Sequence, residues 1–261
     1  MIHPTAIISS KAQISSKVNI GPYCIIEDNV KIDDDNILIS NVHISGHTTI
    51  GKRNIFHPFC SIGSIPQDLK FKGEKSYLHI GDDNKFRENV TVNLGTEGGG
   101  LKTTIKNNCL LMVGSHVAHD CLIDSNVILA NNATLAGHVE LNDNVIIGGN
   151  SAIHQFVKVG KFAMIGGMSG VEKNIIPYGL YTGIRTDLKG INVIGLKRKG
   201  LDNNTISKII DVVKIIFKKD NSIEKNLNNI HDDYKKILEI NEILNFVLNT
   251  KKRGLSKYNH D

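Results

Sequence analysis

The chain has 261 residues, a formal net charge of +5 and only 5% aromatic residues. No apolar run approaches the roughly 18 residues that a membrane-spanning helix needs, which argues against stable insertion into a membrane. The first residues contain no basic segment followed by an apolar one, and a repeat already begins at Ile2, so we expect a cytoplasmic protein without a secretory leader.

A six-residue repeat occupies most of the chain. Every sixth residue is apolar for eleven positions from Ile2 to Ile62, and again for twelve positions from Ile105 to Val171. The residue two places before each of these is usually small or β-branched. Because residues two apart in a strand point to the same face, each repeat sends one large and one small side chain inward. This pattern is typical of a parallel β-helix built from hexapeptides.

The four cysteines fall in the small inward position of this repeat. They are Cys24, Cys60, Cys109 and Cys121, and no two of them form a C-x-x-C pair. Their spacing is therefore that of the scaffold, and we predict buried free thiols.

Two segments interrupt the repeat. Residues 64–77 (SIPQDLKFKGEKSY) and residues 97–102 (EGGGLK) both lose the six-residue period. An insertion in a solenoid projects as a loop and often lies on the binding face. In the first segment, Gln67, Asp68 and Lys70 are polar groups suited to a sugar or a phosphate.

The repeat ends after Val171. Residues 178–187 are predicted to be a linker, and apolar residues then recur at helical spacing from Ile191 to Phe217, with Asp202 as the expected N-cap of one helix. Further helices are expected over residues 222–234 and 235–250. We therefore predict two domains, a mainly β domain over residues 1–187 and a small α-helical domain over residues 188–261.

The positive charge of the chain is concentrated in this tail. Residues 190–261 contain 14 Lys and Arg against 9 Asp and Glu, so the part of the chain before Gly190 is neutral overall. A basic surface of this kind suits an acidic or phosphate-bearing partner, and we expect an acidic protein rather than nucleic acid.

The candidate chemistry lies in residues 117–138. His119 follows the core position Val117 by two places, so it falls at a corner of the helix. Residues three hexapeptides apart occupy the same corner of successive coils, which are about 4.8 Å apart. The period therefore places six residues along one edge within about 10 Å of each other: His119, Asp120, Gly137, His138, His154 and Gln155. His116 adds an outward imidazole just before Val117.

These residue types favour acid–base chemistry. Imidazole is the natural general base near neutral pH. The backbone N–H of Gly137 is unobstructed by a side chain and is suited to hold a developing oxyanion. No serine stands beside a base, so direct attack by a substrate hydroxyl is simpler than a covalent enzyme intermediate. Zinc bound by several histidines between subunits, and plain surface imidazoles, stay open as alternatives.

Four motifs carry a resemblance to a known family. AHDCLIDSNVILANNATLAGHV (118–139), HQFVKVG (154–160), PQDLK (66–70) and GLKRKG (195–200) resemble the acyl-carrier-protein-dependent UDP-N-acetylglucosamine O-acyltransferases of lipid A biosynthesis. The resemblance covers nearly the whole chain. It implies a left-handed helix, a homotrimer with active sites between subunits, and transfer of a (3R)-3-hydroxyacyl group from acyl carrier protein to the sugar 3-hydroxyl. It implies no metal and no cofactor.

The resemblance also implies a role for individual residues. His119 matches the general base, Asp120 its carboxylate partner and Gly137 the oxyanion donor. Gly167 matches the position that limits the length of the acyl chain. The remaining matches are to substrate-binding residues, namely Asp68, Lys70, His116, His138, His154, Gln155, Asn192 and Arg198, and Gln67 of the same loop is expected to bind substrate with them.

The chain departs from the family pattern at three positions. Asn93 and Leu94 replace a usual His-Arg pair, and Ile194 stands where an acidic residue is common. Three other functions are weighed against the O-acyltransferase: the related N-acyltransferase, which carries an extra uridine-binding domain before its repeats, a zinc carbonic anhydrase, and a non-catalytic trimeric scaffold. Lys197, Arg198 and Lys199 are the hypothesised docking site for the acidic carrier protein.

Overall fold

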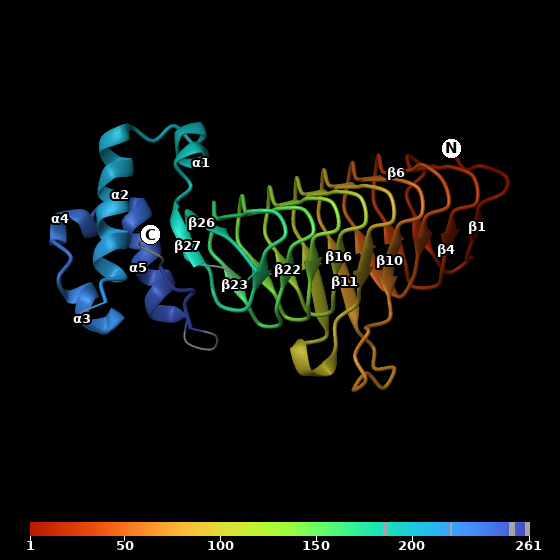
Figure 1. Cartoon of the computed structure of the whole chain (residues 1–261). Helices are drawn as coiled ribbons and strands as arrows, with labels where there is room; N and C mark the ends of the chain where they lie inside the picture. The colour runs from red at the N-terminus through yellow and green to blue at the C-terminus, as the bar shows by residue number, and fades with distance from the viewer. Residues whose placement is uncertain (185–186, 220, 251–253, 259–261) are drawn as a thin grey trace.

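The computed structural model describes residues 1–261 except 185–186, 220, 251–253 and 259–261. Most of the chain winds into a prism with three sides, and helices pack at its C-terminal end (Figure 1). The fold is a left-handed parallel β-helix followed by a small helical part, as predicted. No helix among the described residues is long and apolar enough to cross a membrane.

Each side of the prism is one sheet whose strands belong to successive coils. Sheet A consists of β3 (Asn19–Ile20), β6 (Ile37–Leu38), β9 (Ile55–Phe56), β12 (Lys85–Phe86), β15 (Leu110–Leu111), β18 (Ile128–Leu129), β21 (Ile146–Ile147), β24 (Met164–Ile165), β26 (Gly179–Thr182) and β27 (Asp187–Ile191). Sheet B consists of β1 (Ile7–Ile8), β4 (Ile25–Ile26), β7 (His43–Ile44), β10 (Ser61–Ser64), β13 (Thr91–Asn93), β16 (His116–Val117), β19 (Thr134–Leu135), β22 (Ala152–Ile153) and β25 (Gly170–Val171). Sheet C consists of β2 (Gln13–Ile14), β5 (Lys31–Ile32), β8 (His47–Ile50), β11 (Tyr77–Ile80), β14 (Lys102–Ile105), β17 (Leu122–Ile123), β20 (Glu140–Leu141) and β23 (Lys158–Val159).

The core is a set of aliphatic columns inside the prism. Val117 of β16 pairs with Leu135 of β19, which pairs with Ile153 of β22, and all three side chains are buried. The four cysteines are buried and free, which confirms the predicted thiols. Burial raises the pKa of Cys121 to about 12, so this thiol is neutral and unreactive at physiological pH.

The corners of the prism need backbone in the left-handed region. In the part of the chain that the structure describes, twenty non-glycine residues have positive φ, and eleven of them are Asn or Asp. Their short polar side chains tolerate this conformation better than longer or branched ones. The turn conformation therefore explains the Asn and Asp residues that link the strands, and burial in the core explains the aliphatic residues.

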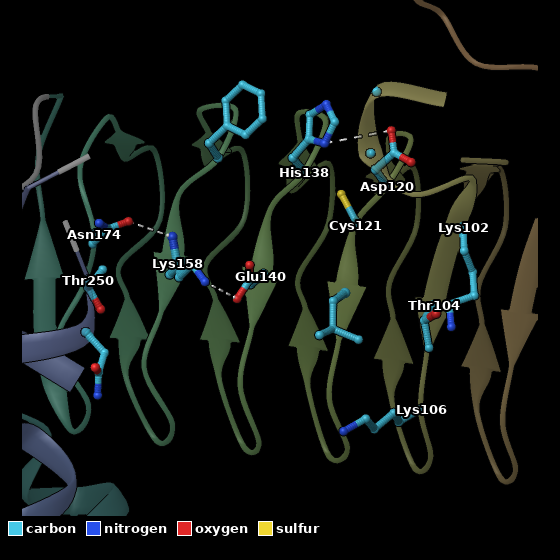
Figure 2. A pocket seen from close by; sticks show the side chains of 15 residues that line it. Lys102, Thr104, Lys106, Asp120, Cys121, His138, Glu140, Lys158, Asn174 and Thr250 are labelled. Carbon is cyan, nitrogen blue, oxygen red and sulfur yellow. Dashed lines mark hydrogen bonds and ion pairs between the residues drawn. The ribbon is translucent and has the colours of Figure 1, made fainter. Parts of the chain in front are cut away.

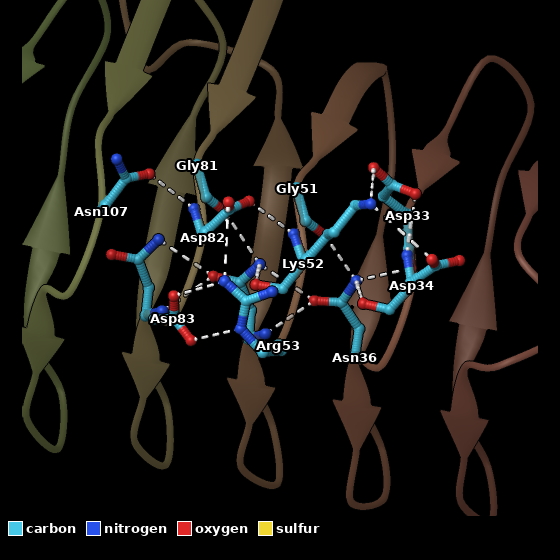
Figure 3. A network of polar contacts seen from close by, with 12 residues as sticks. Asp33, Asp34, Asn36, Gly51, Lys52, Arg53, Gly81, Asp82, Asp83 and Asn107 are labelled. Carbon is cyan, nitrogen blue, oxygen red and sulfur yellow. Dashed lines mark hydrogen bonds and ion pairs between the residues drawn. The ribbon is translucent and has the colours of Figure 1, made fainter.

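One corner is closed by a ladder of buried amides. Asn36, Asn54 and Asn84 occupy the same corner of three successive coils and are fully buried. The Oδ1 atom of Asn36 accepts from the backbone N and the Nδ2 of Asn54, at 2.8 and 2.9 Å. Asn54 repeats both bonds to Asn84 at 2.9 Å. Figure 3 shows the polar network around Asn36 at this corner. Each amide thus satisfies polar groups of its own coil and of the next.

Removing the middle rung is expected to destabilise the prism. Asn54→Ala removes the oxygen that accepts from the buried Asn84 backbone N–H and leaves Asn36 Oδ1 with only the Asn54 backbone N–H, which should lower the free energy of unfolding by about 2–4 kcal/mol. Urea unfolding followed by circular dichroism measures the change. Asn204→Ala on the exposed side of the first long helix is the control. Equal midpoints for both variants would contradict a structural role for the ladder.

Both interruptions of the repeat leave the prism at the edge between sheets B and C, here called the B–C edge. The first loop (residues 65–76) joins β10 to β11, and the second loop (residues 94–101) joins β13 to β14 and contains the short helix η1 (Glu97–Gly99). Figure 1 shows the two loops projecting on the same side. They also touch, because the Glu97 backbone N donates to Glu74 Oε1 at 3.1 Å.

The predicted linker over residues 178–187 was wrong. Strand β26 pairs with β24 and then with β27, so sheet A continues to Ile191, which was expected in a helix. Tyr181 takes the place of the next core aliphatic residue above Ile165 and is fully buried. The sequence spacing between Ile165 and Tyr181 is shorter than the three hexapeptides that separate paired residues of the earlier coils. Because of this shorter spacing and the aromatic core residue, the six-residue pattern did not predict the last coil. The predicted domain boundary at residue 188 falls inside β27.

The tail is helical from Val193 onward. Its helices are α1 (Val193–Arg198), α2 (Asn203–Ile216), α3 (Ile223–Asn228), α4 (Asp232–Lys235) and α5 (Leu238–Asn249). Asp202 caps α2 as predicted, with its carboxylate accepting from Thr205 N at 2.9 Å. The single helix expected over residues 222–234 is two short helices, because Ile230 turns into the core and His231 caps a new helix.

Candidate functional site

The B–C edge stacks candidate residues of three successive coils. Asp120, His138 and Phe156 recur at intervals of three hexapeptides and share the left-handed conformation, with φ of 59°, 61° and 64°. The His138 backbone N donates to the His119 carbonyl at 2.9 Å, and Phe156 N donates to the Gly137 carbonyl at 3.2 Å. These bonds confirm the predicted stacking of Gly137 over His119. The site therefore rests on rigid, hydrogen-bonded backbone.

His119 and Asp120 form a buried pair. The His119 Nδ1 atom lies 2.8 Å from Asp120 Oδ2, and the two residues are 6% and 9% exposed. A carboxylate is an acceptor only, so Nδ1 carries a proton, and in the neutral imidazole Nε2 then keeps its lone pair. Burial opposes the charge of Asp120, but hydrogen bonds from His119 and Thr96 outweigh it and hold the pKa of Asp120 below its ordinary value.

Gly137 lies directly against the imidazole of His119. A Cβ atom at position 137 would be 2.4 Å from His119 Cε1 and 2.6 Å from Nε2. Only glycine permits this approach. Among the described residues, no backbone hydrogen bond uses the Gly137 N–H. A donor without a side chain thus stands beside the basic nitrogen.

The second loop completes the surroundings of Asp120. Thr96 donates to the carboxylate from its backbone N at 2.8 Å and from its hydroxyl at 2.5 Å. Gly99 covers the same group, since a Cβ at position 99 would lie 2.0 Å from Asp120 Cγ. Neither residue was predicted from the sequence. The sequence did contain a signal for these contacts. The second loop takes the place of the B–C corner in the coil before Asp120, so some of its residues were bound to lie near that carboxylate.

His138 packs between the buried pair and an aromatic ring. Its ring is perpendicular to that of His119 at 5.0 Å and stacks on Phe156 at 4.3 Å. Its Nδ1 lies 3.8 Å from Asp120 Oδ2. One ligand atom from each of His119, Asp120 and His138 lies within 4.8 Å of the others, so this is where a metal ion would bind if the zinc alternative held.

Other predicted residues line the edge at greater distance. His116 lies on the outer face of sheet B and is half-buried, and its Nδ1 pairs with the Thr91 hydroxyl at 2.7 Å. Burial, and then the proximity of His119, lower the pKa of His116, which keeps it neutral. His154 and Gln155 are exposed one coil beyond Gly137 and His138.

The predicted residues of the first loop also project from this edge. Gln67 and Lys70 are exposed, and the Asp68 carboxylate accepts from Lys70 N at 3.0 Å, which forms a local turn. The loop is tied to the second loop through Glu74 and Glu97. Both loops therefore lie on the B–C edge with His119. The first loop is two coils before His119 and the second loop is one coil before it.

Three predicted residues lie elsewhere in the chain. Gly167 is at the corner between sheets A and B, where its nearest neighbour is Gly149 of the preceding coil. Asn192 is 8% exposed and is used as the N-cap of α1, with Oδ1 accepting from Gly195 N at 3.0 Å. Asn192 and Arg198 line a pocket of about 410 Å³ against sheet A. A single chain does not bring these residues to the B–C edge.

A large open pocket flanks the edge on the side of sheet C. It has a volume of about 920 Å³ and reaches from the second loop to α5. Figure 2 shows Asp120 and His138 at its rim, with Lys102, Lys106 and Lys158 along its floor. Lys106 and Lys158 pair with Asp124 and Glu140, at 2.6 and 2.8 Å.

Comparison with known proteins agrees with this fold. Residues 102–137 match the family model for bacterial transferase hexapeptides, and residues 174–256 match the second domain of UDP-N-acetylglucosamine O-acyltransferase. The acyl-[acyl-carrier-protein]–UDP-N-acetylglucosamine O-acyltransferase of Thermodesulfovibrio yellowstonii is 46% identical over 98% of this chain and 99% of its own. The chain belongs to this acyltransferase family. The enzyme of the same name from Rickettsia canadensis is 44% identical over 98% of this chain and 97% of its own. The solved structure of LpxA from Acinetobacter baumannii superposes with a TM-score of 0.95, at 40% identity over 98% of this chain and 99% of that one.

Asn93 and Leu94 are the two neighbouring positions that were predicted to depart from the family pattern. Both residues are buried, at 3% and 6% exposure. Asn93 Nδ2 donates to the Ile65 carbonyl at 3.2 Å, which fastens the first loop to β13. Leu94 packs near Gly46 and belongs to the core. Asn93 thus holds the first loop in place, and Leu94 anchors the start of the second loop in the core.

Proposed function

We propose that this acyltransferase moves a (3R)-3-hydroxyacyl group from acyl carrier protein to the 3-hydroxyl of UDP-N-acetylglucosamine, as the first step of lipid A biosynthesis. The names of relatives that cover 98% of the chain support the two substrates. The observation that carries the mechanism is the buried pair of His119 and Asp120, with Nε2 facing Gly137. A cytoplasmic location remains our prediction.

In the proposed reaction, His119 Nε2 takes the proton of the sugar hydroxyl as its oxygen attacks the thioester carbon. The negative charge that develops on the carbonyl oxygen is stabilised by the Gly137 N–H. The carbon–sulfur bond then breaks, and the imidazolium returns its proton to the leaving thiolate. Asp120 balances the charge of the imidazolium during both steps.

No covalent enzyme intermediate is proposed. Cys121 is the nearest thiol in sequence to His119, but it is fully buried and points into the core. Its pKa is raised to about 12 by burial, so it cannot serve as a thiolate nucleophile. Direct transfer to the sugar needs only the base and the oxyanion donor. It needs neither a metal nor a cofactor.

A homotrimer is also part of the proposal, because the three faces of the prism differ. The outward residues of sheet A are largely aliphatic, namely Ile37, Ile55, Leu110, Ile128 and Ile146. The corner between sheets A and B exposes Tyr23, Phe59 and Met168, which are 60–76% exposed. Sheet C instead presents Lys31, His79, Thr104, Glu140 and Lys158. Threefold packing of sheet A against a neighbour's sheet B would bury the aliphatic face of sheet A together with the apolar side chains at that corner.

This packing would complete the site from two chains. Asn192 and Arg198 stand against sheet A, whereas His119 stands at the far border of sheet B. When sheet A of one subunit meets sheet B of the next, the two sets approach each other across the seam. The proposed active site therefore lies between subunits, with the base from one and the nucleotide-binding residues from the other.

One assay tests the function directly. The purified protein is incubated with UDP-N-acetylglucosamine and carrier-bound 3-hydroxyacyl chains of graded length, with and without a zinc chelator, and the product is identified by mass. We expect an ester at the sugar 3-hydroxyl and no effect of the chelator. An amide product would favour the N-acyltransferase. Bound zinc with carbon dioxide hydration would favour the anhydrase, and no product at all would favour the scaffold.

Of the three residues in the hypothesised carrier docking site, Lys197, Arg198 and Lys199, the last is already engaged by other residues of the chain. Lys199 Nζ pairs with Glu239 at 2.8 Å and lies 5.1 Å from the centre of the Phe162 ring. Charge reversal of Lys197 is therefore the cleaner test. We expect Lys197→Glu to raise the KM for the acyl carrier substrate several-fold and leave kcat unchanged, and Lys208→Glu on α2 to change neither. An unchanged KM in the first variant would reject this docking site.

A further inference from the structure

The carboxylate of Asp120 is held by more groups than its partner imidazole. Its side chain is completely buried. Oδ1 accepts the backbone N–H of Thr96 at 2.8 Å, and Oδ2 accepts both the Thr96 hydroxyl at 2.5 Å and the His119 Nδ1 at 2.8 Å. Both oxygens are thus fixed, and one residue supplies two of the three donors.

Thr96 is itself held firmly in the second loop. It is 4% exposed and has an extended backbone, with φ of −126° and ψ of 162°, immediately before η1. Its carbonyl accepts from Gly99 N at 3.1 Å and from Leu101 N at 2.8 Å. The preceding residue, Gly95, donates to the Tyr77 carbonyl at 3.2 Å. The hydroxyl therefore meets the carboxylate in one geometry.

We propose that Thr96 is a positioning residue of the acyl transfer. It holds Asp120 in the orientation in which the carboxylate accepts the hydrogen bond from His119 Nδ1. This inference rests on the proposed function of the His119 pair. Thr96 touches neither substrate in it and acts only through Asp120. The loop that contains Thr96 then has a catalytic purpose beyond covering the site.

The hydroxyl has two separable effects. First, it fixes the plane of the carboxylate, so that the Nδ1 bond points the basic Nε2 at Gly137. Second, it withdraws charge from Oδ2, the oxygen that faces the imidazole. Without the hydroxyl, the more negative carboxylate would hold the imidazolium proton more tightly, and less free base would exist at a given pH. A structural hydroxyl would produce neither a kcat loss nor a shift in the pH profile.

The test compares Thr96→Val, which lacks the hydroxyl, with Thr96→Ser, which keeps it. We expect the valine variant to lose about 10- to 100-fold in kcat, the range for a hydrogen bond to a buried charge, with the KM of both substrates nearly unchanged. The acidic limb of its kcat/KM profile should move to higher pH. The serine variant should recover most of the activity and the original pH profile.

A matched control separates this role from simple loss of a buried hydroxyl. Thr48 is fully buried, and its hydroxyl donates to the Ser45 carbonyl at 2.6 Å in a coil far from the B–C edge site at His119. Thr48→Val should lower stability and leave kcat and the pH profile unchanged. If Thr96→Val behaves in the same way, the positioning role is rejected. If His119→Ala also stays active, the proposed function itself fails.

A second pair of variants tests the loop should Thr96→Val fail to fold. An alanine Cβ at Gly99 would lie 2.0 Å from Asp120 Cγ, whereas one at Gly98 has no atom within 4 Å. Gly99→Ala should displace the carboxylate and reproduce the loss in kcat and the shift of the acidic limb. Gly98→Ala should behave as the wild type. Equal kinetics in these two neighbours would overturn the proposal.

Discussion

Replacing His119 by alanine is expected to lower kcat by about 10²- to 10⁴-fold, the range that general-base catalysis contributes. The imidazole presents its free nitrogen to Gly137, whereas the carboxylate of Asp120 is already occupied by donors. Because the side chain is small and lies at a corner outside the aliphatic columns, the fold should survive. Single-turnover assays with the carrier-bound acyl chain measure the loss.

The control for this variant is another imidazole of the same sheet. His43 lies on the outer face of β7, where it pairs with Glu27 at 2.9 Å and is several coils away from His119. His43→Ala should retain full activity. Size-exclusion chromatography with light scattering should give the same assembly for both variants. Activity of His119→Ala within tenfold of wild type would refute the assignment of the base.

Gly137→Ala is expected to lower kcat by about 100-fold or more, since displacements near 1 Å in a reacting group have effects of this size. The new methyl group would lie 2.4–3.0 Å from three atoms of the His119 ring, closer than real Cβ atoms approach. The ring cannot retreat freely, because Asp120 and His138 hold it from other sides. It must rotate, and Nε2 then no longer faces the substrate hydroxyl.

A milder glycine substitution provides the comparison. A Cβ at Gly149 would meet only the Asn131 carbonyl, at 3.2 Å. Gly149→Ala should therefore change kcat little. Thermal unfolding of both variants checks that the difference is catalytic. If Gly137→Ala keeps wild-type kcat, the ring is not confined as described, and the oxyanion donor would need to be sought elsewhere.

The sequence predicted the prism well because its period is a direct record of its geometry. Val117, Leu135 and Ile153 are separated by three hexapeptides each, and they stack in register as expected. The same arithmetic placed His119 and Gly137 on one edge. The last coil was not predicted, because Tyr181 stands where an aliphatic residue was expected and its spacing from Ile165 differs from that of the earlier coils.

The surroundings of the site were harder to predict. Thr96 and Gly99 lie in a segment without period, so their contacts with Asp120 follow from the path of a loop that no spacing rule describes. Phe156 did lie in the same register as His138, but its ring gave no chemical signal. Residues that act through periodic backbone were thus predictable, and residues brought by irregular backbone were not.

The two interrupted coils have a consequence for how new specificity is acquired. Both coils are longer than the regular ones, yet Tyr77–Ile80 pairs residue for residue with His47–Ile50 below and with Lys102–Ile105 above. The length of the loop between sheets B and C therefore does not affect how the strands of neighbouring coils pair. Segments of other lengths can therefore join sheets B and C at this border, while the scaffold that presents the imidazole is left untouched.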